Sequence, residues 1–134
     1  MARCFGAKLG CAHFHTDFAI PAVASNRVII FKNDGSGHFG SASVIPVPFS
    51  CRNMALGDYD ADGDLDLTVP SSSAGTVSIL ENDSLGSSAL TSALVVDSPY
   101  YIATSDLNND RALDLVVANG EADAVPILLG ESKP

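Results

Sequence analysis

Positive charge is scarce in this sequence of 134 residues: seven Lys and Arg stand against 16 Asp and Glu, for a formal net charge of −9. Nucleic acids and anionic membrane surfaces are bound through basic patches, so neither is expected as a partner. A run of about 20 apolar residues, which a membrane-spanning helix requires, is also missing. The sequence therefore predicts no nucleic-acid binding and no membrane insertion.

Cysteine is sparse too, and Cys4, Cys11 and Cys51 allow at most one disulfide bond, so the redox compartment stays open. The first 15 residues hold no continuous apolar stretch, and no signal peptide is visible. A mature or internal piece of a longer chain and a cytosolic protein both fit this observation. His13 and His15 join Cys4 and Cys11 as zinc-type ligands, but their spacing matches no familiar zinc site.

The last missing feature is a segment with the hydrophobic period of an α-helix and capping residues at its ends. Hydrophobic residues make up 46% of the sequence and charged residues 17%, which is enough apolar surface for a packed core. The apolar residues occur in short β-branched runs that Gly, Ser, Asn or Pro interrupt, as is typical of strands. We therefore predict an all-β protein.

The sequence repeats itself with a unit of about 48 residues. Asp17, Asp66 and Asp114 lie 49 and 48 residues apart, and a short apolar run follows each. A valine lies 11 positions beyond each aspartate and an isoleucine 13 positions beyond it: Val28, Val77 and Val125, then Ile30, Ile79 and Ile127. Three copies in one register indicate a repeat protein.

The middle copy predicts four strands, at Met54–Gly57, Leu65–Val69, Thr76–Glu81 and Leu90–Val96. Four short strands in one unit are typical of a β-propeller blade. We thus expect four-stranded antiparallel blades, fewer than three in number, either as a partial propeller or as a fragment that self-associates. The predicted division is a leader or degenerate strand at 1–16, a partial blade with strands two to four at 17–52, a complete blade at 53–98 and a partial blade at 99–134.

Asp58 to Asp66 reads DYDADGDLD and alternates oxygen ligands with spacers. Calcium takes about 6–8 oxygen ligands, and such a loop offers side chains at positions 1, 3, 5 and 9 and a carbonyl at 7. Gly63 at position 6 permits the sharp turn. The predicted ligands are Asp58, Asp60, Asp62, Asp66 and the Asp64 carbonyl. An EF-hand is excluded because its twelfth position, a glutamate, is Val69 here.

A second loop, Asp106 to Asp114, keeps the same pattern with Asp106, Asn108, Asp110, Asp114 and the Ala112 carbonyl as predicted ligands. Arg111 stands where glycine is wanted, and a non-glycine residue in the left-handed conformation is strained. We expect calcium to bind this loop more weakly. The copy that ends at Asp17 has Leu9, Cys11 and His13 in place of aspartates and predicts no site.

These features resemble the FG-GAP/VCBS repeat of integrin α-subunit propellers and of many bacterial surface proteins. The acidic loop, the apolar strand after it and the NDGSGHFG turn at Asn33 to Gly40 carry the resemblance over roughly residues 17 to 130. It implies a propeller fold, Ca²⁺ as cofactor, and an adhesive or scaffolding role outside the cytosol or at the cell surface. Its partner would be a protein or carbohydrate, bound on the face away from the calcium loops.

We therefore predict a non-enzymatic calcium-binding module, either as a homo-oligomer or as part of a larger propeller. The alternative is a fragment of a propeller-bearing extracellular enzyme, such as one that degrades polysaccharides. That enzyme would need clustered acid and base residues in a groove. The acidic residues outside the loops show no such cluster in the sequence, which favours the binding module.

Overall fold

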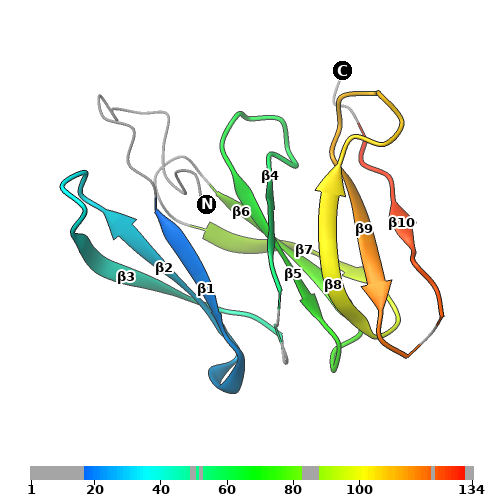
Figure 1. Cartoon of the computed structure of the whole chain (residues 1–134), viewed down its shortest axis with the longest axis horizontal. Helices are drawn as coiled ribbons and strands as arrows, with labels where there is room; N and C mark the ends of the chain where they lie inside the picture. The colour runs from blue at the N-terminus through cyan, green and yellow to red at the C-terminus, as the bar shows by residue number, and fades with distance from the viewer. Residues whose placement is uncertain (1–16, 49–50, 52, 83–87, 122, 132–134) are drawn as a thin grey trace.

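The computed structural model describes residues 17–48, 51, 53–82, 88–121 and 123–131. In this part of the chain all regular structure is β-strand, apart from one turn of 3₁₀-helix at Val23–Ser25. The strands form three antiparallel sheets that lie side by side in chain order (Figure 1). No helix within these ranges is long and apolar enough to cross a bilayer. The predicted all-β fold with blade-like antiparallel sheets is confirmed.

The first sheet has the order β1-β2-β3, with strands Phe18–Ala22, Arg27–Asn33 and Phe39–Pro46. The second has the order β4-β5-β6-β7, with strands Ala55–Gly57, Asp66–Ser71, Thr76–Asn82 and Ser88–Val95. The third has the order β10-β9-β8, with strands Pro99–Ser105 (β8), Asp114–Asn119 (β9) and Ile127–Leu128 (β10). The four strands of the second sheet lie where the middle repeat predicts them, within two residues at each end.

The repeat is visible in the register of the strands. Ile30, Ile79 and Ile127 are equivalent positions in the sequence, and they pair with Ala19, Thr68 and Val116. These three partners are also equivalent, because each lies two residues beyond its aspartate. One pairing pattern is thus used in all three sheets. The boundaries at 17–52, 53–98 and 99–134 stay a prediction, as does the leader at 1–16, which lies outside the described residues.

Two apolar cores join the sheets. Val28 and Ile30 of the first sheet pack with Leu67, Val69 and Leu80 of the second. Val77 of the second sheet packs with residues of the third in the same way, namely Ile102, Leu115 and Val117. Because side chains alternate between the two faces of a strand, the two faces of the second sheet contribute to different cores. Cys51 lies in the first core as a free thiol, and its burial raises the pKa of that thiol to about 11.

Candidate metal centre

The two acidic loops connect equivalent strands and begin and end at equivalent positions. The first connects β4 to β5, and the second connects β8 to β9. In each loop the ninth position, Asp66 or Asp114, is the first residue of the strand that follows. Both loops emerge at the same end of the sheets in Figure 1. The strand pairing therefore fixes where each loop starts and stops, and only the residues between can adjust.

In the first loop, carboxylates hold the backbone in a tight coil. Asp58 Oδ2 accepts a hydrogen bond from the Gly63 N–H at 2.9 Å, and Asp60 Oδ1 accepts one from the Asp62 N–H at 3.1 Å. Asp62 Oδ1 accepts one from the Asp64 N–H at 2.8 Å. Gly63 has φ +91°, the left-handed conformation that favours glycine. The loop is thus closed around its own acidic side chains.

This coil brings three carboxylates together. One oxygen from each of Asp58, Asp60 and Asp66 lies within 4.8 Å of the other two. Asp58 Oδ1 is buried and has no hydrogen-bond partner. A buried carboxylate oxygen without a partner is costly, and a hard cation would satisfy it. The first loop therefore fits calcium, and these three residues with Asp62 and the Asp64 carbonyl stay its predicted ligands.

Asp66 has a second role beside the cation site. Its side chain is fully buried, and it accepts the Tyr59 N–H through Oδ2 and the Asn82 N–H through Oδ1, both at 2.9 Å. Burial raises the pKa of Asp66, and the negative charges of Asp60 and Asp62 raise it further. A divalent cation beside these carboxylates would act in the opposite direction and favour the charged form.

The hydrogen bond across the sheet recurs in every repeat. Oδ1 of Asp17 accepts the Asn33 N–H at 2.8 Å, and Oδ1 of Asp114 accepts the Gly130 N–H at 2.9 Å. In each case, as with Asp66, the donor lies 16 residues further along the chain. The aspartate thus ties the start of one strand to the end of the next. Sequence reasoning missed this role, although its signal is visible: Asp17 persists in a copy whose other ligand positions are lost.

The second loop has the same backbone but a different ligand set. Asp106 Oδ2 accepts the Arg111 N–H at 3.0 Å, which matches the bond between Asp58 and Gly63. Asp110 is engaged at both oxygens, since Oδ1 accepts the Ala112 N–H and Oδ2 accepts the Asn108 side-chain amide, each at 2.8 Å. Three carboxylates in place of five give less attraction for a cation. Asp106, Asn108, Asp110, Ala112 and Asp114 stay the predicted ligands of a weaker site.

Arg111 adopts the conformation that its position demands. Its φ of +75° lies close to the +91° of Gly63, so the loop keeps its shape despite the side chain. No carboxylate of the described residues forms an ion pair with its guanidinium. The predicted strain therefore lies in the backbone of Arg111, at a cost of about 1 kcal/mol.

We expect Arg111→Gly to raise the free energy of unfolding by up to about 1 kcal/mol in the presence of chelator, because glycine adopts positive φ without steric cost. Chemical denaturation measures the change. Arg111→Lys is the matched control, since it also removes the guanidinium but retains the Cβ, and we expect no gain from it. Equal stabilisation by both variants would contradict backbone strain as the cause.

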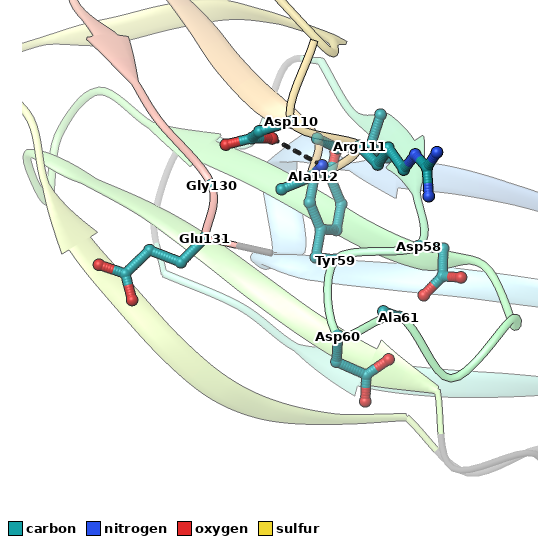
Figure 2. Close-up of a pocket in the computed structure, with 10 residues that line it drawn as sticks. Asp58, Tyr59, Asp60, Ala61, Asp110, Arg111, Ala112, Gly130 and Glu131 are labelled. Carbon is teal, nitrogen blue, oxygen red and sulfur yellow. Dashed lines mark hydrogen bonds between the residues drawn. The ribbon is translucent and has the colours of Figure 1, made fainter. Parts of the chain in front are cut away.

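A pocket of about 350 Å³ lies between the two loops. Figure 2 shows Asp58, Tyr59 and Asp60 of the first loop on one side and Asp110 and Arg111 of the second on the other. Tyr59 packs into the core between the second and third sheets, and its hydroxyl lies 3.3 Å from Thr68 Oγ1. The two loops are thus neighbours, and Tyr59 of the first loop packs on the core that the second and third sheets share.

A family model described as an FG-GAP-like repeat matches the chain twice, at residues 15–69 and at residues 58–117. Together the matches span well over half of the 134 residues, and both include the whole first loop. No curated protein and no solved structure matches the chain. The family match confirms the resemblance seen in the sequence.

Proposed function

Because the chain belongs to the FG-GAP-like repeat family, we propose that it is a non-enzymatic calcium-binding module. Calcium rigidifies the propeller-type scaffold, and the scaffold binds a protein or carbohydrate ligand in adhesion, outside the cell or at the cell surface. The observation that carries the proposal is the group of Asp58, Asp60 and Asp66, with the orphaned Oδ1 of Asp58 inside it. A cation is the missing partner that this chemistry calls for.

Rigidity rather than reactivity is the role that suits this position. The first loop enters β5 through Asp66, whose carboxylate also receives a backbone N–H from the end of β6. A cation held by the loop would fix that carboxylate, and with it the start of β5 and the end of β6. The ligand surface then belongs at the opposite end of the sheets, where the turns after β1 and β5 lie (Figure 1).

Calcium is expected to stabilise the folded chain strongly. A ligand that binds only the folded form adds about 2.7 kcal/mol at 100 times its dissociation constant. For a chain of this size that corresponds to a rise in Tm on the order of 10 °C. Thermal melts in calcium and in chelator measure the difference, with magnesium as the control cation. Equal melting temperatures in calcium and chelator would sink the proposal.

A further inference from the structure

The two cores between the sheets are built from equivalent positions. In the first core the β2 positions Val28 and Ile30 meet Leu67, Val69 and Leu80 of the next sheet. In the second core Val77, the equivalent of Val28, meets the equivalents of those three residues: Leu115, Val117 and Leu128. In both cores, the face with Val28 or Val77 contacts the following sheet. The face with Leu67 or Leu115 contacts the preceding sheet.

In the third sheet, the face equivalent to the Val28 face of the first sheet is exposed to solvent. Val125 and Ile127 are the equivalents of Val28 and Ile30, yet they are 61% and 54% exposed where Val28 and Ile30 are 0% and 2% exposed. Tyr101 and Leu129 are exposed as well. We name the set Tyr101, Val125, Ile127 and Leu129 the trailing face. The other two sheets bury the equivalents of Val125, namely Val28 and Val77, and the first sheet buries Ile30, the equivalent of Ile127.

The first sheet presents the complementary kind of face. Phe18, Ile20 and Phe31 are the equivalents of Leu67, Val69 and Leu80, and Ile20 is 41% exposed where Val69 is 0% exposed. The Phe18 ring stacks on Phe31 and meets Phe39 edge-on, both at 4.7 Å between centroids. We name the set Phe18, Ile20, Phe31, Phe39 and Val44 the leading face. It is preformed, because its rings already support one another.

Charge favours contact between the two faces. Outside the second loop, residues 99–131 carry three exposed acidic side chains and no basic one, namely Glu121, Asp123 and Glu131, whereas residues 17–48 carry two acidic and two basic ones. Arg27 is exposed and, by strand alternation from the buried Val28, points to the leading face. Contact between the first sheet of one copy and the third sheet of another therefore brings Arg27 toward acidic side chains. Contact between two third sheets would bring like charges together.

We propose that the trailing face of one copy of this chain docks on the leading face of a second copy. The contact continues the register of the two internal cores, with Val125 and Ile127 against Phe18, Ile20 and Phe31. It is a head-to-tail interface, and two copies use it twice to close a ring of six sheets, within the range of about 4–8 blades known for propellers. Neither face contains a predicted calcium ligand, so the inference does not depend on calcium binding.

The solution mass of the 134-residue chain tests the proposal. Light scattering on a sizing column in calcium buffer is expected to give twice 13.8 kDa. Ile127→Asp, which blocks the trailing face, and Ile20→Asp, which blocks the leading face, are each expected to give monomers. Both positions are exposed, so circular dichroism should show an intact fold. Ala24→Asp, which adds the same charge at the exposed turn after β1, is the control and should stay dimeric.

Mixing the two monomeric variants separates a head-to-tail contact from a symmetric one. The pair retains one intact leading face and one intact trailing face, so a head-to-tail contact restores a dimer of twice the monomer mass. A symmetric contact would instead leave one of the two single variants dimeric by itself. A monomeric wild-type chain, a dimeric single variant or a mixture that stays monomeric would each overturn the proposal, whatever the outcome of the calcium melts.

Discussion

Asp66→Ala is expected to lower the free energy of unfolding by about 2–5 kcal/mol even with all calcium removed. The substitution leaves two backbone donors, the N–H groups of Tyr59 and Asn82, without the acceptors that they now have at 2.9 Å. An unsatisfied buried donor costs about 1–3 kcal/mol. Burial raises the pKa of the Asp66 carboxyl group, so the buried charge is itself unfavourable. The variant no longer buries this charge, which offsets part of the loss. Urea denaturation in chelator gives the value directly.

Asp60→Ala is the control for this experiment. Asp60 belongs to the same carboxylate group, but the hydrogen bond that it accepts, from the Asp62 N–H, lies in an exposed stretch of the loop. In chelator the loss should stay below about 1 kcal/mol, because water replaces that bond. Asp114→Ala should resemble Asp66→Ala, since Asp114 is buried and accepts the Leu107 and Gly130 N–H groups. Equal losses for Asp60 and Asp66 would show that Asp66 is a ligand and nothing more.

The double role of Asp66 marks the limit of what its sequence predicts. Alternating aspartates and a glycine predict a coiled acidic loop, because ligand chemistry and turn chemistry are both local. The hydrogen bond to Asp66 Oδ1 comes from an N–H group 16 residues away. Only the pairing of β5 with β6 brings that group close. Aspartate at the ninth position therefore has two independent reasons to be there. The copy at Asp17 keeps one reason after its loop has lost the other.

The burial of the repeated valines shows a similar limit. Val28, Val77 and Val125 are equivalent in sequence, and the repeat predicts the same strand and the same register for all three. Two of them are fully buried and the third is 61% exposed. Burial depends on the sheet that follows, and a sequence pattern describes a face without its neighbour. The fold could thus be predicted unit by unit, but the repeat pattern alone could not show which copy of the valine is exposed.

The same distinction between local and distant partners governs the calcium response. We expect Asp60→Ala to abolish most of the rise in Tm that calcium produces, because it removes one of the three carboxylates that converge within 4.8 Å. That loss amounts to about 2.7 kcal/mol at 100 times the dissociation constant. Melts of the variant in calcium and in chelator should then differ only by the smaller contribution of the second loop, whereas the wild-type melts should differ by the full rise.

Asp110→Ala is the matched substitution in the second loop, and we expect it to remove a smaller part of the calcium response. Both carboxylate oxygens of Asp110 already accept hydrogen bonds, from the Ala112 N–H and from the Asn108 amide. The second loop also has three carboxylates, whereas the first has five. The first loop should therefore fill at lower calcium concentration. Titration calorimetry of the two variants measures each site alone, and a tighter site in Asp60→Ala than in Asp110→Ala would reverse the assignment. Because Tyr59 joins the first loop to the core beneath the second, the two affinities are also expected to be coupled, with each loop binding more tightly when the other is filled.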